Sequence, residues 1–428
     1  MKFRLTWLAA ASVLLQIQAM GQAGGTALHN AVYDARIKTV QLYRDEWNLS
    51  YPVMPLNGNG RLFLNFDLLG SESADFHYRF IHCTKDWTES SIFEQDYIEG
   101  FNDNPVEDCT PSFNTTVQYY HYRIGFPNDR VSLKRSGNYI IAVYRAGEPD
   151  RPVLMQRFMI TEDVAAVKAS MHRPLGTDDN SAGQQIDFTL TGLQGIVDPM
   201  RNIYAFVLQN GRWDNAKTNL KADFYRTGEL QYGSLSGKNI FRGGNEYRYF
   251  DIRNLRYQTE YIKSIDYNGQ GYNVLLLPSE SREFSPYFYN PDFNGKYYIA
   301  VQDGRDFDTD ADYVNVFFTL RSKQMIAGGK MYVSGGAGNW TFDKNSLMTY
   351  NAAAGQYECA MLLKQGYYNY EYTFLKDGVT DGSASLFEGN HYETENDYMI
   401  LVYYRNPRDR YDRLIVAHVA NTLNRPAG

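Results

Sequence analysis

The chain has 428 residues and a formal net charge of −7 at pH 7. This charge excludes nucleic acid as a main partner and gives no electrostatic reason to bind an anionic membrane surface, because both need clustered excess Lys and Arg. With 36 Tyr, 24 Phe and 35 Gly, the composition favours pleated strands joined by tight turns over helices.

Residues 1–23 are predicted to be a secretory signal peptide that is absent from the mature protein. Its features are two basic residues, an apolar run and small residues at a cleavage site, namely Lys2, Arg4, residues 5–17, Ala19, Gly21 and Ala23. The apolar run is too short to span a bilayer of about 30 Å, and no later stretch approaches the ~20 apolar residues required. We therefore expect an exported chain with no membrane span.

A first β-sandwich is predicted over residues 30–162. Short runs of alternating or β-branched and aromatic residues indicate its strands, at residues 61–69, 75–82, 117–126, 138–144 and 153–160. Gly, Asn, Asp and Pro separate the runs, and no amphipathic helix lies between them. This pattern is typical of an antiparallel sandwich of immunoglobulin or fibronectin type, although the immunoglobulin Cys-Trp-Cys spacing is absent.

Two further sandwiches are predicted, over residues 163–321 and 322–428, so that the fold class is all-β with tandem antiparallel sandwiches. The polar stretches at 161–181 and 322–329 suit joints between them. The expected strands lie at 185–191, 203–209, 246–252, 271–277, 295–302, 313–320, 330–333, 355–364, 367–374, 398–404 and 412–419. The last sandwich resembles early-set and starch-binding domains.

Three cysteines are too few for a disulfide-stapled framework. Cys83 and Cys109 fall in the same predicted sandwich and are candidates for a disulfide, because exported proteins meet an oxidising compartment. The sequence does not set their distance, and two separate buried thiols are the alternative. Cys359 lies in an alternating strand and is expected to be a small core residue.

No catalytic, nucleotide or metal motif emerges, and we predict a protein that is not an enzyme and has no cofactor. The hydrolase pattern Gly-x-Ser-x-Gly is missing. The glycine-rich stretch 335–339 leads into Trp340 in a β-rich region, where a plain turn is expected. The seven His are scattered, and His121 lies in an aromatic strand, so packing is expected there and not metal binding.

The acidic stretch 303–312 is the best metal candidate, because carboxylates at alternate positions can converge on a hard cation. Its acids are Asp303, Asp306, Asp308, Asp310 and Asp312. It departs from the calcium hand-loop pattern, since the turn position lacks Gly and the twelfth position lacks Glu. A solvated acidic loop is therefore predicted.

Aromatic residues of the last sandwich could stack on a sugar ring, and the candidates are Trp340, Tyr367, Tyr368 and Tyr370. Burying an aromatic side chain removes about 150–250 Å² from water, which is worth roughly 4–6 kcal/mol at about 25 cal/mol per Å². Most of the tyrosines are therefore expected to be structural. The alternating stripe of Tyr368, Tyr370 and Tyr372 is predicted to be core.

Several strings of residues together resemble the type IX secretion system plug proteins of the Bacteroidetes, a family long classed as a domain of unknown function. The resemblance covers nearly the whole mature chain. The strings are His82-Cys83-Thr84-Lys85-Asp86-Trp87 with Ser90, residues 97–101, 112–115, 120–122, 127–128, 136–139, 157–158, 312–314 with Phe317, 366–370, 388–389 and 393–394.

The resemblance implies a periplasmic protein, held at the outer membrane through its protein partner, that caps the inner mouth of the translocon barrel protein when no substrate occupies it. It implies no site residues. A reversible cap should have a polar interface, with Tyr and Arg as anchors.

Two other functions stay open. A carbohydrate-binding accessory protein would use its C-terminal sandwich and Trp340, and an exported hydrolase has the least support because no nucleophile is evident.

Overall fold

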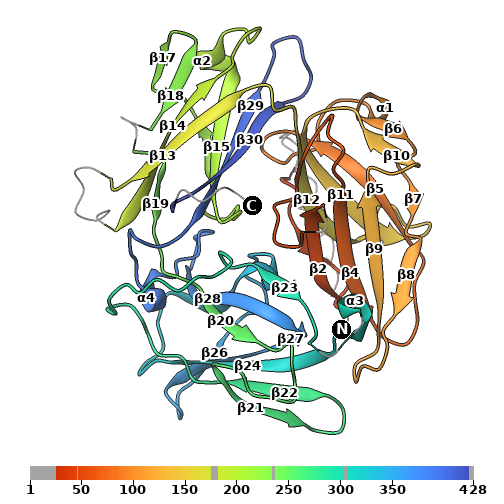
Figure 1. Ribbon diagram of the computed structural model, residues 1–428, viewed down its shortest axis with the longest axis vertical. Coiled ribbons are helices and arrows are strands. Elements are labelled where there is room, and N and C mark those ends of the chain that lie inside the picture. Colours follow the sequence, from red (N-terminus) through yellow and green to blue (C-terminus); the bar gives the residue numbers. More distant parts are fainter. Residues whose placement is uncertain are drawn as a thin grey trace, which may run out of the picture.

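The computed structural model describes residues 26–45, 47–174, 182–233, 237–302, 304 and 306–423. Within them the chain forms three β-sandwiches, seen as three lobes in Figure 1. This confirms the predicted all-β class. The predicted signal peptide, residues 1–23, lies outside the described residues. Among the described helices, none has the length and apolar character needed to cross a membrane.

The first sandwich packs two sheets around a core that includes Phe66, Phe80 and Phe158. Sheet A has the order β1-β12-β11-β5-β7, with β3 paired to β12, and sheet B has the order β2-β4-β9-β8. Sheet A comprises β1 (Ala31–Val32), β3 (Val53–Pro55), β5 (Phe76–Cys83), β7 (Asn104–Pro105), β11 (Gly137–Arg145) and β12 (Pro152–Thr161). Sheet B comprises β2 (Ile37–Arg44), β4 (Leu62–Leu69), β8 (Asp108–Pro111) and β9 (Tyr119–Phe126). A small ribbon and a one-turn helix complete it, namely β6 (Ile98–Gly100), β10 (Val131–Leu133) and α1 (Glu94–Tyr97).

The second sandwich combines sheet D, of order β13-β14-β18-β17 with β19 paired to β14, and sheet E, of order β16-β15-β29-β30. Sheet D comprises β13 (Ala166–His172), β14 (Gly183–Thr191), β17 (Phe224–Arg226), β18 (Glu229–Tyr232) and β19 (Ile240–Arg242). Sheet E comprises β15 (Ile203–Gln209), β16 (Lys217–Leu220), β29 (Asp397–Tyr404) and β30 (Arg413–Asn421), and α2 (Pro199–Asn202) precedes β15.

The third sandwich combines sheet F, of order β20-β28-β23 with β25 paired to β28, and sheet G, of order β21-β22-β24-β27-β26. Sheet F comprises β20 (Arg248–Asp251), β23 (Tyr297–Ile299), β25 (Gly329–Ser334) and β28 (Gly366–Lys376). Sheet G comprises β21 (Ile262–Tyr267), β22 (Tyr272–Leu276), β24 (Tyr313–Arg321), β26 (Thr349–Asn351) and β27 (Gln356–Lys364). Its short helices are α3 (Phe307–Asp310), η2 (Gly336–Gly338) and α4 (Ser385–Glu388).

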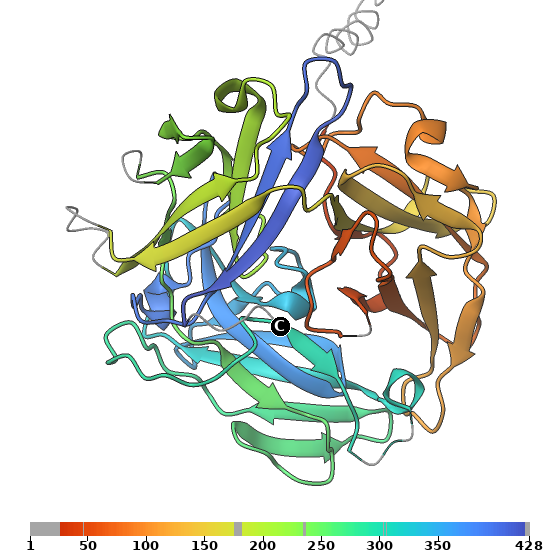
Figure 2. The ribbon, with the colours of Figure 1, turned by 45° about the horizontal axis from the view of Figure 1, so that its top comes forward.

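The expected boundary at residues 321 and 322 does not separate the sheets. β24 and β27 lie on opposite sides of that boundary and pair along their whole lengths in sheet G. β29 then returns to the second sandwich and pairs with β15, so that the β29–β30 hairpin lies between green strands of the second sandwich and orange strands of the first in Figure 2. The second and third sandwiches are therefore interleaved in sequence and not consecutive.

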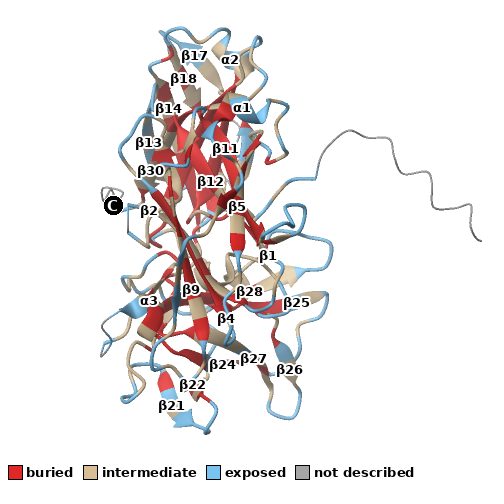
Figure 3. Ribbon diagram, turned by 90° about the vertical axis from the view of Figure 1, so that its right-hand side faces the viewer, coloured by how far each residue is buried: buried red, intermediate tan, exposed pale blue. Residues whose placement is uncertain are grey.

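The central strands of sheets A and E are buried on both faces. Tyr139 and Ile141 of β11 point into the first core, whereas Ile140 and Ala142 meet Leu401 of sheet E in a separate cluster. Figure 3 shows β11 and β12 as buried over most of their lengths. Sheets B, A, E and D thus form four layers, and the continuous apolar runs of β11 and β29 reflect burial on both sides.

Candidate functional site: buried junctions between the sandwiches

Each sandwich meets the other two through a buried junction, and these junctions hold several of the residue strings singled out in the sequence, among them residues 82–87, 136–139 and 312–314. The apolar junction joins sheet A to sheet E. Its members are Cys83, Trp87, Ile140, Ala142, Met155 and Met159 from the first sandwich, and Phe206, Leu208, Met399, Leu401, Tyr403 and Leu414 from the second.

A tight turn in the string His82–Trp87 inserts the indole of Trp87 into the apolar junction. The backbone N–H of Thr84 donates to the carbonyl of Thr88 at 2.7 Å, and the backbone N–H of Trp87 donates to the carbonyl of Thr84 at 2.9 Å. Trp87 adopts φ = 66° to make this turn. Its ring meets Trp213 edge-on, with centroids 5.0 Å apart, and the guanidinium of Arg157 lies 4.3 Å from the ring centroid. The string is therefore a docking turn.

His82 anchors that turn as a neutral side chain. Burial lowers the pKa of His82 to about 4, so the ring is uncharged at neutral pH. Its Nε2 lies 3.1 Å from the carbonyl of Ser136 and its Nδ1 lies 2.8 Å from the hydroxyl of Ser90. Nε2–H donates to the carbonyl, and Nδ1 accepts from Ser90.

Gly137 lets the backbone of the first sandwich approach the second. It has φ = 130°, and a Cβ there would lie 2.9 Å from His82 Nε2 and 3.0 Å from the carbonyl oxygen of Asp412. Beside it the hydroxyl of Tyr403 donates to Asn138 Oδ1 at 2.7 Å. Lys85 N–H donates to the carboxylate of Asp412 at 2.9 Å. A polar rim thus surrounds the apolar contact.

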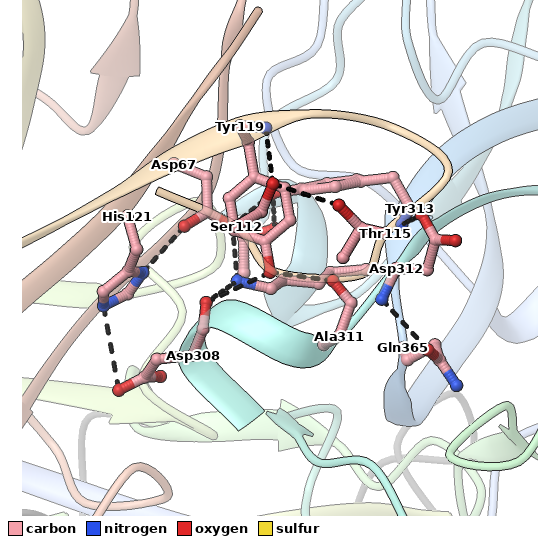
Figure 4. Close-up of polar contacts among 12 residues, drawn as sticks. Asp67, Ser112, Thr115, Tyr119, His121, Asp308, Ala311, Asp312, Tyr313 and Gln365 are labelled. Carbon is pink, nitrogen blue, oxygen red and sulfur yellow. Dashed lines mark hydrogen bonds and ion pairs between the residues drawn. The ribbon is translucent and has the colours of Figure 1, made fainter. Parts of the chain in front are cut away.

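The Asp67 junction joins sheet B to the third sandwich (Figure 4). Lys364 Nζ lies 2.7 Å from Asp67 Oδ2, and each side chain is 1% exposed. Tyr313 donates its hydroxyl to the same oxygen at 2.7 Å, while His121 Nδ1 lies 2.7 Å from Asp67 Oδ1. Burial acts to raise the pKa of Asp67, but the attraction of Lys364 and these contacts outweigh it, so that the pKa is lowered. Asp67 is therefore a charged, fully paired carboxylate.

The acidic stretch 303–312 forms the other half of the Asp67 junction. Asp306 caps α3 by accepting from Asp308 N–H at 2.9 Å. The carboxylate of Asp312 accepts from the backbone N–H groups of Thr116 at 2.8 Å and Val117 at 3.1 Å. The prediction of a solvated loop is wrong for Asp312, which is buried because it satisfies these donors of the first sandwich. Asp303 lies outside the described residues.

The Arg212 junction joins the second and third sandwiches. The guanidinium of Arg212 contacts Asp214 Oδ2 at 2.6 Å and Glu371 Oε1 at 3.0 Å. It also lies 5.0 Å from the ring centroid of Trp340, and Tyr247 meets that ring edge-on at 5.8 Å. Burial raises the pKa of Glu371 to about 7, although Arg212 acts to lower it.

All three sandwiches meet at Lys296. Its Nζ donates to the carbonyl of Leu49 at 2.7 Å and lies 3.6 Å from the ring centroid of Tyr51. Tyr51 in turn donates its hydroxyl to Asp397 of β29 at 3.0 Å. Burial lowers the pKa of Lys296 to about 8. The three junctions therefore form a closed ring.

The cysteines predicted as a disulfide candidate are free thiols in the structure. Cys83 faces the apolar junction, whereas Cys109 of sheet B packs against the core of the first sandwich. Sheet A lies between these two clusters, and this separation is the physical reason that the two thiols do not pair. Cys359 packs against the third core, as expected.

The sugar-stacking candidates differ in burial. Tyr368, Tyr370 and Tyr372 are buried, which confirms the predicted core stripe. Tyr367 is partly exposed, but its ring stacks between Tyr249 at 5.4 Å and Tyr298 at 5.7 Å. Trp340 is half-buried and takes part in the Arg212 junction. Neighbouring side chains thus already occupy the ring faces that a sugar would need.

The Asp67 junction contains residue types that are found in catalytic sites, namely Lys364, Asp67, His121 and Tyr313. A substrate, however, has no access to them. Asp67 and Lys364 are enclosed, and Tyr119 and Tyr313 are buried beside them. No group of three or more His, Cys, Asp or Glu among the described residues could hold a metal ion. What the junction can do is to hold two sandwiches in a fixed orientation.

The sequence analysis did not predict that these residues lie at contacts between sandwiches. The signal present in the sequence was the continuous apolar runs at 139–144 and 398–403, whose length and lack of alternation indicate strands buried on both faces.

Comparison with known proteins identifies the family. The model of the first domain of the type 9 secretion system plug protein matches residues 37–162. The crystal structure of a hypothetical protein from Parabacteroides merdae is similar to this chain, with 36% identity and a TM-score of 0.88, and the match covers 92% of this chain and 99% of that chain. No curated protein matches the sequence. The chain therefore belongs to the type IX secretion system plug protein family.

Proposed function

We propose that this protein is a non-enzymatic plug in the periplasm. It closes the periplasmic opening of the outer-membrane type IX translocon barrel when no substrate is in transit. The observation that carries the proposal is the closed ring of buried junctions, in which sheets A and E are covered on both faces. A wide pore is sealed only by a body that keeps its shape, and buried apolar and ion-pair contacts resist local opening.

The chemistry of the surface also supports a reversible cap. The buried charged side chains, such as those of the Asp67–Lys364 and Arg212–Glu371 pairs, lie inside junctions, where they hold the sandwiches together. Two hollows, of about 880 Å³ and 710 Å³, are lined by both polar and apolar side chains. A polar, hollowed surface suits contacts that form and release, because transient interfaces are more polar than obligate ones.

The proposal is tested by deleting the gene and measuring both leakage and secretion. We expect the outer membrane to admit a large hydrophilic antibiotic while type IX secretion continues, and the tagged protein to copurify with the translocon barrel. Reintroducing the wild-type gene should restore the barrier. An intact barrier after deletion, together with no copurification, contradicts the proposal.

Carbohydrate binding remains the alternative, and Trp340 is its only specific residue. Its test is a glucan array with the wild type and Trp340→Ala. Saturable binding that the substitution abolishes would favour this alternative, and the absence of binding across the array would exclude it for these glucans.

A further inference from the structure

The loop between β22 and β23, residues 277–296, exposes two phenylalanine rings to solvent. Phe284 is 91% exposed and Phe288 is 79% exposed. Scattered exposed apolar residues are ordinary on protein surfaces, but these two lie four positions apart in one loop, on either side of Pro286. We call residues 277–296 the aromatic loop.

The aromatic loop is fastened on both sides of each ring. Before Phe284, Arg282 donates through Nε to Glu388 at 2.8 Å and through Nη2 to the carbonyl of Glu246 at 2.9 Å. Its backbone N–H also donates to the carbonyl of Phe387 at 2.7 Å. These acceptors lie in the buried interior of the third sandwich and its border with the second. The start of the loop is therefore fixed.

The end of the loop is fixed in the same way. On either side of Phe288, Tyr287 donates its hydroxyl to Glu246, and Tyr289 donates to Glu395 at 3.0 Å. Farther along, Phe293 N–H donates to Asn369 Oδ1 at 2.6 Å. Arg282, Tyr287 and Tyr289 thus point inward and hold the backbone of the loop, while Phe284 and Phe288 are exposed to solvent.

A rigidly held loop with two exposed aromatic rings is suited to binding a partner protein. Binding normally loses free energy by ordering loops and side chains, and a loop that is already held loses less. Aromatic residues presented in this way are typical energetic centres of protein interfaces. The fold therefore supports two apolar groups in a fixed position that nothing in the described chain covers.

The charge of the loop decides between occupants. No Lys or Arg occurs among residues 283–295. Glu283 is exposed next to Phe284 in the sequence, whereas the exposed Glu280 is paired with Arg321 at 2.9 Å. An anionic lipid surface requires clustered basic residues and does not fit. A protein pocket that is apolar at its base and cationic at its edge does fit, since complementary charge steers association.

We propose that Phe284 and Phe288 insert into an apolar, cation-edged pocket on the periplasmic face of the translocon. This inference rests on the proposed plug function and specifies the surface that performs it. The aromatic loop is the anchor, and the junctions hold the other two sandwiches in a fixed orientation relative to it.

The test is copurification of the translocon with the full-length protein in three forms. They are the wild type, Phe284→Ser with Phe288→Ser, and a matched control, Phe101→Ser with Phe113→Ser, whose rings are 75% and 73% exposed on the first sandwich. We expect the loop variant to bind at least about tenfold more weakly, as for hot-spot aromatics. The control should bind like the wild type, and all three should have the same Tm because the rings are exposed.

The outcomes separate the two proposals. If the wild type copurifies and the loop variant does so equally well, the loop assignment falls and the plug function stands. If the wild type does not copurify, both fall. Binding to vesicles of phosphatidylethanolamine and phosphatidylglycerol, or self-association in solution, that the loop variant loses would also overturn the assigned partner.

Discussion

At the scale of single residues, the Asp67–Lys364 pair shows how much the fold relies on matched charge. Both side chains are enclosed, and the carboxylate also receives Tyr313 and His121. A buried ion pair adds little over a well-packed apolar pair, because removing two charges from water is expensive. Losing one partner is different, since it leaves the other charge buried and alone.

We predict that Lys364→Met lowers the free energy of unfolding by about 3–5 kcal/mol. Adding Asp67→Asn should recover part of this loss, because the amide still accepts hydrogen bonds and carries no charge. The control is Arg36→Met, which breaks the exposed pair with Asp34 and should change stability by less than about 1 kcal/mol. Denaturant titrations measure all three. Equal losses in Lys364→Met and in the control would contradict the prediction.

Asp292 should make stability depend on pH. Burial is the main reason that its pKa rises to about 8, whereas an unfolded Asp titrates near about 3.9. Between these values the folded chain holds a proton that the unfolded chain has released. The free energy of unfolding therefore falls as pH rises through this window, by up to about 1.4 kcal/mol per pH unit for one proton.

We predict that Asp292→Asn flattens this fall between about pH 4 and 8. The amide oxygen can still accept from the backbone N–H of Asn294, which lies 2.6 Å from Asp292 Oδ1. Melting temperatures measured across this range check it, with the exposed Asp150→Asn as control. Parallel curves for Asp292→Asn and the wild type would show that Asp292 does not titrate in this window.

At the scale of elements, the central strands β11 and β29 have no face exposed to solvent. Ile140 and Ile141 are neighbours on β11, yet the first packs in the apolar junction and the second in the core of the first sandwich. In an isolated sandwich, alternate residues of this strand would face water. The second sandwich covers that face here.

We predict that Ile140→Ala and Ile141→Ala each destabilise the protein by about 2–5 kcal/mol, because both remove buried methyl and methylene groups. Val164→Ala, at a 53% exposed side chain, should change stability by no more than about 0.5 kcal/mol. Equilibrium unfolding in urea distinguishes them. A loss at Ile141 with none at Ile140 would mean that the apolar junction contributes little.

Local sequence pattern located many of the strands, because alternating or continuous apolar runs reflect the burial of a strand. It missed β2, β21 and β13, and β13 lies in the stretch 161–181 that was interpreted as a joint. Residues 203–209 and 398–404 coincide with β15 and β29 to within a residue. Which strands pair could not be predicted in this way. β15 and β29 lie nearly 200 residues apart in sequence, as the partners Phe206 and Leu401 show, and an apolar run carries no information about its neighbour.

The junction residues were equally hard to interpret from sequence. Asp312 read as a metal candidate because carboxylates at alternate positions fit a cation, but its partners are backbone N–H groups of residues 116 and 117. Nearly every residue has a backbone N–H group, so no sequence motif indicates which of these groups a carboxylate will bind. The family strings marked important positions, and only the fold shows that His82, Trp87 and Gly137 serve the apolar junction.

At the scale of the whole molecule, the ring of junctions is closed. The first sandwich meets the second at the apolar junction and the third at Asp67, and the second meets the third at Arg212. A chain of three sandwiches could hinge at one contact, but in a ring the other two contacts oppose that motion. The four layers in Figure 1 and the third lobe beneath them should therefore move as one body.

We accordingly predict that the three sandwiches unfold in one cooperative transition. Trp87 and Trp213 report the apolar junction by fluorescence and Trp340 reports the Arg212 junction, whereas far-ultraviolet circular dichroism reports the sheets. Coincident curves from the two probes are the signature of two-state unfolding. Multidomain proteins of this length commonly unfold in steps, so coincidence would be informative. If fluorescence changes at lower denaturant than dichroism, the junctions open while the sheets persist, and the protein is three linked bodies rather than one.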